Sequence, residues 1–163
     1  MIRLALLTGS CADRSVADEL SDYDISFFCS DPQKLTESNI WLEDIDDVWV
    51  MISEKYVLLE ATIPTKLVIF KGGKKVDFSF FSLHQLKKLE INGLPDPFNM
   101  GYNVLVDKDL LANKLPLPQF KGFRETRPSE AEFHSLIKEF WFEVHHVAKY
   151  LYRRDLWSVQ FRL

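Results

Sequence analysis

"TGSCADRSVADELSDYDISFF", residues 8–28, is the stretch on which the prediction of the fold depends. A small-residue turn, Gly9-Ser10, follows a short apolar run, and two aspartates, Asp22 and Asp24, open a run rich in β-formers. Small residues at a strand end let backbone N–H groups approach a phosphate closely. Residues two apart in a strand point to the same face, so the two carboxylates are expected to project together. Carboxylates this close need a proton, a basic partner or a divalent cation.

A third acid stands in another clear pattern, "TKLVIFKGGKKVDFSFFSL", residues 65–83. Two β-rich runs flank Gly72-Gly73, which supplies the positive φ of a tight hairpin turn. On the second run Asp77 alternates with apolar neighbours, so it is expected on a strand. Mg²⁺ prefers oxygen ligands and often binds one or two carboxylates plus substrate phosphates. A pair of acids alone is more simply a solvated turn, but a phosphate-binding turn, the pair and a third acid together predict phosphoryl or nucleotidyl transfer.

The rest of the chain predicts short strands and helices followed by one long helix. Further strands are expected at residues 3–8, 47–54 and 102–108, and a short helix at residues 82–90. A capping box of Ser129 and Glu132 precedes apolar residues at helical spacing, which predicts a helix over about residues 129–155. This order indicates the α+β fold class, with a mainly antiparallel or mixed sheet flanked by helices.

The domain organisation follows from one irregular, proline-rich stretch at residues 116–128. Such a stretch, without apolar periodicity, is typical of a linker. We therefore expect a sheet-containing domain over residues 1–115, a linker over residues 116–128, and a separate helical segment over residues 129–163.

Composition limits the classes of partner. The net charge of −4 argues against nucleic acid as the main partner and is compatible with a cationic substrate. Cys11 and Cys29 have no metal-ligand or disulfide spacing, which predicts reduced thiols in a cytoplasmic protein. No apolar run approaches the roughly 18 residues of a membrane span. The short apolar run at the N-terminus is interpreted as a first strand rather than a leader.

"LLTGS" followed by "DYDI" resembles the signature of the polymerase-β-like nucleotidyltransferases, and Asp77 in "KVDFSFF" resembles the third carboxylate of that fold. With "VLVDKD" and "EFWFEVHHVAKYL", these stretches are similar to the bacterial aminoglycoside 6-adenylyltransferases, the streptomycin-modifying family, in order and over nearly all 163 residues. That family usually has Arg after the Gly-Ser pair, where this chain has Cys11. The resemblance also implies that residues 129–163 are the start of a truncated helical C-terminal domain.

The resemblance implies that AMP moves from ATP, with Mg²⁺, to a hydroxyl of an aminoglycoside, a cationic small molecule. Asp22 and Asp24 would ligate the metal, and Asp77 would be either a third ligand or the base that takes the hydroxyl proton. The residues expected to bind the nucleotide are Gly9, Ser10, Arg14 (in place of the usual arginine) and Lys149.

Two other functions stay open on the residues alone. The chain's length is compatible with a minimal nucleotidyltransferase that modifies a protein, as in toxin–antitoxin pairs. The departure at Cys11 is compatible with a nucleotide-binding or interaction module that has lost catalysis. The histidine pair His145-His146 has no further ligand at metal-binding spacing and is interpreted as a helix-surface feature. The apolar face of the long helix predicts self-association.

Overall fold

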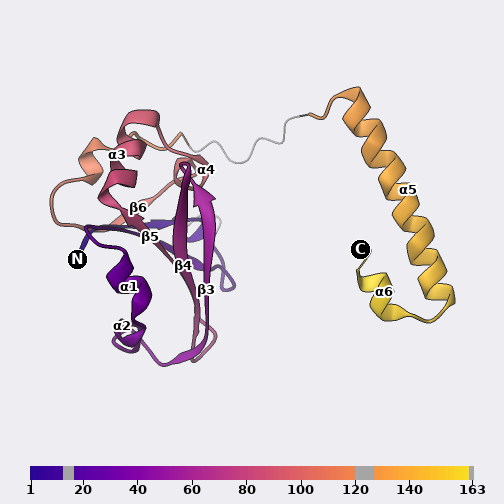
Figure 1. Cartoon of the computed structure of the whole chain (residues 1–163), viewed down its shortest axis with the longest axis horizontal. Coiled ribbons are helices and arrows are strands. Elements are labelled where there is room, and N and C mark those ends of the chain that lie inside the picture. Colours follow the sequence, from indigo (N-terminus) through magenta and orange to yellow (C-terminus); the bar gives the residue numbers. More distant parts are fainter. Residues whose placement is uncertain (13–16, 120–126, 162–163) are drawn as a thin grey trace. The chain divides into compact units, whose positions relative to one another are not determined.

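The computed structural model describes residues 1–12, 17–119 and 127–161. The chain divides into two compact units, Met1–Phe123 and Arg124–Leu163. The first unit contains the sheet and the second is helical (Figure 1). The predicted linker lies partly outside the described residues, so the predicted domain limits stay a prediction.

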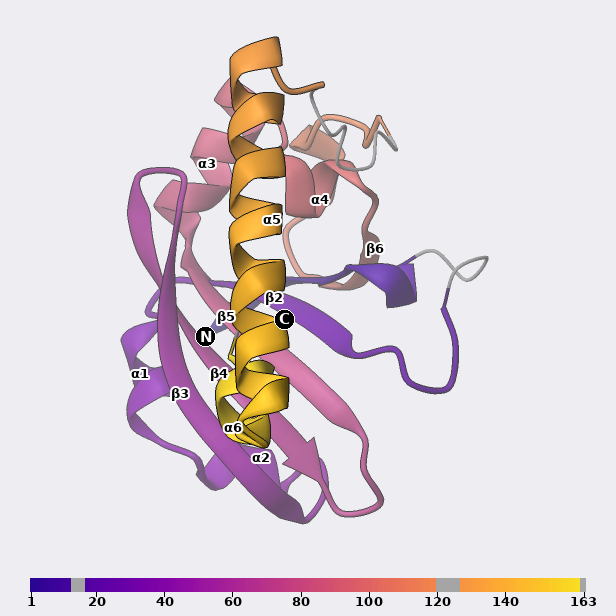
Figure 2. The ribbon, with the colours of Figure 1, turned by 90° about the vertical axis from the view of Figure 1, so that its right-hand side faces the viewer.

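Six strands form one mixed sheet in the first unit. They are β1 (Ile2–Thr8), β2 (Tyr23–Cys29), β3 (Val48–Leu58), β4 (Ala61–Phe70), β5 (Lys75–Ser82) and β6 (Asn103–Asp107). Their order is β3-β4-β5-β2-β1-β6, and all neighbours are antiparallel except β2 and β5, which run parallel. The predicted α+β fold with a mixed sheet is therefore confirmed. Figure 2 shows the long strands β3 and β4 twisting together.

Short helices connect and cover the strands. They are α1 (Gln33–Glu37), α2 (Ile40–Glu43), α3 (Leu83–Asn92) and α4 (Asp96–Asn99), with 3₁₀ turns η1 (Ser10–Ala12) and η2 (Ala112–Lys114). The short helix expected at residues 82–90 is α3, and a capping box between Ser82 and Gln85 begins it.

The two faces of the sheet bear separate apolar cores, because side chains alternate along each strand. The core beneath α1 and α2 contains Leu42, Val68, Phe70, Val76, Phe78 and Phe80. The core beneath α3 and α4 contains Leu4, Leu6, Phe28, Ile63, Phe81, Leu86, Leu89, Phe98 and Leu115. On β5, Phe78 and Phe80 face the first core, whereas Asp77 and Ser79 share the side of Phe81. Asp77 thus emerges on the α3–α4 face of the sheet, four residues before the core residue Phe81.

One of the two hairpins was predicted from the sequence and the other was not. The Gly72-Gly73 turn joins β4 to β5 with φ values of 89° and 87°, as predicted. The turn between β3 and β4 uses Leu59 and Glu60 in the left-handed region, with φ values of 54° and 59°. Neither turn residue is of a type that normally favours a positive φ, so the sequence did not indicate this turn. The strand predicted at residues 47–54 was therefore too short, since β3 continues to Leu58.

The second unit contains α5 (Glu130–Tyr152) and α6 (Leu156–Gln160). The Ser129–Glu132 capping box begins α5, as predicted. The helix ends earlier than the predicted residue 155, because Arg154 has a φ of 58° and Asp155 caps α6 by accepting from the Ser158 amide at 3.0 Å. No helix in the described ranges combines the length and the apolar composition needed to cross a bilayer.

Candidate active site

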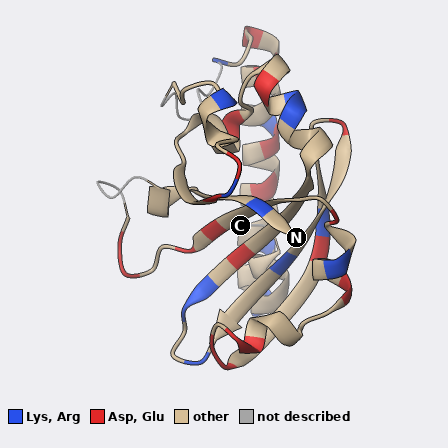
Figure 3. Cartoon of the chain, turned by 90° about the vertical axis from the view of Figure 1, so that its left-hand side faces the viewer, with Lys and Arg blue, Asp and Glu red and all other residues tan. Residues whose placement is uncertain are grey.

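Asp24 and Asp77 lie side by side at the centre of the sheet. They are register partners on the parallel strands β2 and β5, which are about 4.8 Å apart in a typical sheet. Asp22 lies just before β2 rather than in it, which corrects the expectation that both members of the pair belong to one strand. The ammonium of Lys75 bonds to Asp22 Oδ2 at 2.5 Å and to Asp77 Oδ2 at 3.2 Å. The three predicted acids therefore gather around one lysine, and acidic and basic segments lie close together on these strands (Figure 3).

Asp77 has one carboxylate oxygen with a partner and one without. Its side chain is 20% exposed, and Oδ2 accepts from Lys75. The other oxygen, Oδ1, is buried and has no hydrogen-bond partner among the described residues. A buried oxygen without a partner costs about 1–3 kcal/mol. In folded proteins such an atom usually meets a water, an ion or a ligand.

Asp24 lies directly against the Gly9 backbone. Gly9 has a φ of 68°, and a Cβ built on it would lie 2.1 Å from Asp24 Oδ2. No other residue type could occupy this position without moving the carboxylate. On the next strand, Thr8 pairs with Asp24 in register and donates to its backbone oxygen at 3.3 Å. The small-residue turn therefore allows close contact between the end of β1 and an acid of β2.

The surroundings of Asp24 oppose its ionisation. Burial raises its pKa, and the charge of Asp77 and, less strongly, of Asp22 raises it further, whereas Lys75 lowers it. The resulting pKa is about 6, above the ordinary 3.8. A carboxylate in this state would gain more from a bound cation than a solvated one.

A cavity of about 380 Å³ opens over Asp24 and Asp77. Its lining residues are Thr8, Gly9, Asp24, Ile25, Ser26, Glu54, Tyr56, Thr65, Leu67, Asp77, Ser79, Pro97, Phe98 and Met100. Three of these are carboxylates, and none is Lys, Arg or His. The charged groups that line the cavity are therefore all acidic, which suits it to cations.

The donor set fits a hard divalent cation, although no cluster of three or more metal-ligating side chains is formed within the described ranges. Asp24 and Asp77 are neighbours across the parallel strands, and Asp77 Oδ1, which has no partner among the described residues, offers an oxygen ligand. Asp22 is held by Lys75 and would have to leave that lysine to join them. Two carboxylates with substrate phosphates are enough for Mg²⁺.

The other residues predicted to bind the nucleotide differ in whether the structure describes them and in which unit they lie. Ser10 begins η1 and is exposed, and the Asn103 side-chain amide donates to the last residue of this turn, Ala12, at 2.8 Å. Arg14 lies outside the described residues. Lys149 lies on α5 in the second unit, with its ammonium 4.7 Å from the centre of the Tyr150 ring, so its link to the acids stays a prediction.

Several residues at this site were missed by the sequence reasoning. Tyr56 and Glu54 come from β3, and the Tyr56 hydroxyl donates to Ser79 Oγ at 3.2 Å. Burial raises the Tyr56 pKa, the Ser79 bond lowers it, and the nearby charge of Asp24 raises it. Strand alternation alone could have found the shared face of Glu54 and Tyr56, but not that β3 lies two strands from the acids.

The surroundings of the Cys11 thiol oppose its ionisation. Its thiol lies 3.9 Å from the backbone oxygen of Ser21. Burial raises its pKa, and the charges of Asp24, Asp22 and Asp18 raise it further. The thiolate needed for reactivity is therefore disfavoured.

The mixed sheet, the glycine turn and the neighbouring carboxylates are the features that the sequence led us to expect of an α+β nucleotidyltransferase domain. Residues 1–163 match the family model described as streptomycin adenylyltransferase, and the chain belongs to this family. The resemblance found in the sequence is thereby confirmed.

Two curated relatives are similar to nearly the whole chain. The aminoglycoside 6-adenylyltransferase of Bacillus subtilis (strain 168) is 29% identical over 163 residues, covering 95% of this chain and 55% of the relative. That of Staphylococcus aureus is 27% identical over 162 residues, with the same coverage of 95% and 55%. A crystal structure of an aminoglycoside 6-adenyltransferase from Bacillus subtilis aligns with a TM-score of 0.46 at 23% identity, covering 99% of this chain and 54% of that one. The chain spans about half the length of the curated relatives it matches.

Proposed function

We propose that this chain carries the nucleotidyl-transfer site of an adenylyltransferase that moves AMP from ATP to a hydroxyl of a cationic aminoglycoside, with streptomycin as the first substrate to test. The observation that supports this most strongly is Asp77 Oδ1, which has no hydrogen-bond partner among the described residues and lines a cavity with Asp24 and Glu54. Family membership supports the same reaction class.

Asp24 and Asp77 would hold Mg²⁺, and Asp22 would join them when it leaves Lys75. Bound there, the ion would supply Lewis acidity to the α-phosphoryl group and to the leaving pyrophosphate. The backbone at Gly9 and the Ser10 hydroxyl would hold the terminal phosphates, as the small side chains allow. Lys75, once released from Asp22, would be free to bind a phosphate oxygen.

In the reaction, a bond forms between the acceptor oxygen and the α-phosphorus as the bond to the β-phosphate oxygen breaks. Pyrophosphate leaves with that electron pair, and the hydroxyl proton passes to a carboxylate. Asp77 is the candidate base if Asp24 and Asp22 alone hold the metal.

An antibiotic-modifying enzyme of this kind would act in the cytoplasm, where ATP is available. A protein target and a catalytically silent nucleotide-binding module are the competing functions. Each predicts a different fate for the label of α-labelled ATP, so a single transfer assay separates all three.

The experiment incubates the full chain with α-labelled ATP and Mg²⁺, with streptomycin and without it. We expect label on streptomycin, lost on chelation of the metal. Label on protein with none on the drug would instead support a protein-modifying enzyme. Binding of Mg-ATP by calorimetry without any transfer would indicate an inactive module, and absence of both would refute the proposed function.

A further inference from the structure

The cavity over Asp24 and Asp77 extends across β4 to β3, which forms the end of the cavity farther from these two aspartates. Glu54 and Tyr56 are two residues apart on β3, point to one face and both line the cavity. Strand β4 lies between β3 and β5. Two strand spacings are roughly 10 Å, so Glu54 lies on the opposite wall from Asp77 and is too far to share a metal ion with it.

A row of polar side chains connects the two walls. In register, Glu54 pairs with Thr65, Thr65 with Ser79, and Ser79 with Ser26. Asp77 and Asp24 lie two residues before Ser79 and Ser26 on β5 and β2. The floor of the cavity therefore has hydroxyl groups between a carboxylate at one end and a pair of carboxylates at the other, which matches a polyhydroxylated ring.

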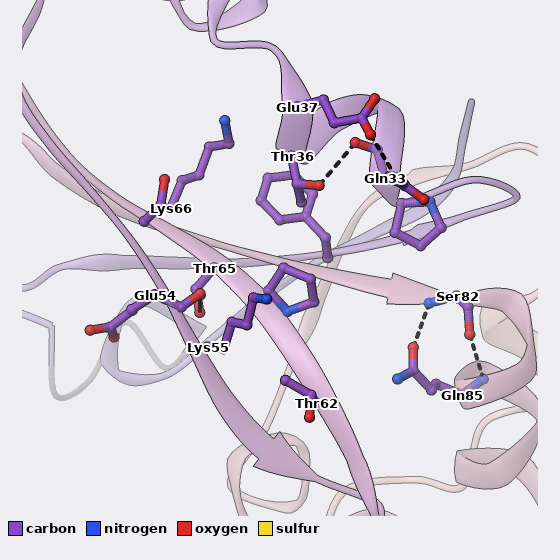
Figure 4. A pocket seen from close by; sticks show the side chains of 14 residues that line it. Gln33, Thr36, Glu37, Glu54, Lys55, Thr62, Thr65, Lys66, Ser82 and Gln85 are labelled. Carbon is purple, nitrogen blue, oxygen red and sulfur yellow. Dashed lines mark hydrogen bonds between the residues drawn. The ribbon is translucent and has the colours of Figure 1, made fainter.

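The opposite face of β3 does not neutralise Glu54. A second cavity of about 660 Å³ opens mainly on that face, between α1 and β4, and its lining residues include Lys55 and Lys66 as well as Glu54 itself. Figure 4 shows Lys55 reaching toward the other lining side chains, whereas the Glu54 carboxylate points away from them. The Lys66 ammonium is already bound to Ser38 O at 3.1 Å and to Asn39.

Glu54 and Asp24 are the acids of this cavity that make no ion pair among the described residues. Lys75 pairs with Asp77, and Asp24 lies under the influence of the same lysine. The Glu54 carboxylate is exposed and has no hydrogen bond or ion pair among the described residues. An anionic triphosphate would be repelled from this wall, so Glu54 is available for the cationic co-substrate.

We infer that Glu54 is a specificity-determining residue that binds an ammonium or guanidinium group of the acceptor, about one sugar ring from the hydroxyl that reacts beside Asp24 and Asp77. Tyr56 forms the adjoining wall, with its ring held by the bond to Ser79. This inference rests on the proposed function, since it deepens the description of the same site.

The test compares Glu54→Gln with Glu43→Gln, which makes the same charge change on α2, over the opposite face of the sheet. Calorimetry measures the Kd of streptomycin and of Mg-ATP for the full chain and both variants, at low and at raised salt. Steady-state transfer measures KM and kcat separately. Circular dichroism checks that all three proteins unfold at similar temperatures.

We expect Glu54→Gln to raise the Kd and KM of streptomycin at least tenfold while the Kd of Mg-ATP and kcat change less than twofold, with Glu43→Gln unchanged. A streptomycin Kd within twofold of the parent in Glu54→Gln would overturn the inference, even if transfer persists and the proposed function stands. A parent chain that does not bind streptomycin would overturn it too. If the parent chain does not bind Mg-ATP, that result would count against the proposed function instead.

Discussion

The Cα of Gly9 faces the carboxylate of Asp24 so closely that an added Cβ would lie 2.1 Å from its Oδ2. We predict that Gly9→Ala displaces this carboxylate and lowers adenylyl transfer at least 100-fold. The positive φ of 68° adds a strain of about 1 kcal/mol for alanine, so stability also falls. Transfer of label from ATP and thermal unfolding together measure the two effects.

The control for this variant is Gly73→Ala. Gly73 also has a positive φ, 87°, but an added Cβ there meets nothing within 4 Å. The control therefore carries the same kind of backbone strain without the contact to an acid. If both variants lose activity to the same extent, strain rather than the clash with Asp24 is the cause, and Gly9 has no special place at the site.

A second prediction concerns pH and Asp24. Its folded pKa of about 6 exceeds the 3.8 of an ordinary aspartate. Between these values the folded chain keeps a proton that the unfolded chain has lost, so stability falls as pH rises from 4 through 6. We expect Asp24→Asn to escape this loss and to be more stable than the parent at pH 7.5 without metal. Solvent screening of a half-exposed group reduces the gain to about 1 kcal/mol.

Urea unfolding at pH 4.0 and pH 7.5, in the presence of a chelator, measures the difference. The gain in Asp24→Asn should shrink to nearly nothing at pH 4.0, while transfer activity is lost at either pH. If Asp24→Asn is less stable than the parent at pH 7.5, the folded chain stabilises the ionised Asp24 carboxylate, which contradicts the prediction.

Lys75 supports a third prediction, because it holds Asp22 and Asp77 together. Lys75→Gln removes the positive charge between two carboxylates and should lower stability by about 1 kcal/mol or less without metal. Added Mg²⁺ should then raise the melting temperature of the variant more than that of the parent. Lys74→Gln, at an exposed residue of the adjacent turn, is the matched control. Equal responses to Mg²⁺ in all three proteins would argue against metal binding at these acids.

The apolar face of α5 supports a fourth prediction. No residue of this helix is buried, and Phe133, Leu136 and Phe140 are each more than half exposed. We expect light scattering to show self-association at micromolar concentrations, reduced by Phe140→Glu. A clean monomer over that range would contradict the expectation drawn from the sequence.

Much of the fold could be predicted because its signals are local. The Gly72-Gly73 turn and the Ser129 capping box each act within a few residues, and both formed as expected. The turn at Leu59-Glu60 and the helix break at Arg154 lacked such signals. These residue types seldom adopt a positive φ, and they do so here because the surrounding structure fixes the backbone. The long β3–β4 hairpin was missed for that reason.

The candidate site was predictable as a set of acids but not as an arrangement. Asp22, Asp24 and Asp77 stand out in the sequence by spacing and alternation. Their meeting depends on the parallel register of β2 and β5, which pairs residues 53 positions apart and leaves no trace in either strand alone. Glu54 enters through β3, whose place in the sheet was likewise not deducible.

The most direct test of the central claim is calorimetric titration of the full chain and its Asp77→Asn variant with Mg-ATP, since Asp77 carries the buried oxygen that has no partner in the part of the chain that the structure describes. We predict that the parent binds Mg-ATP and that the variant, with its fold intact by circular dichroism, binds it at least tenfold more weakly. Binding by Asp77→Asn as tight as by the parent would contradict the claim that these acids form a metal–nucleotide site.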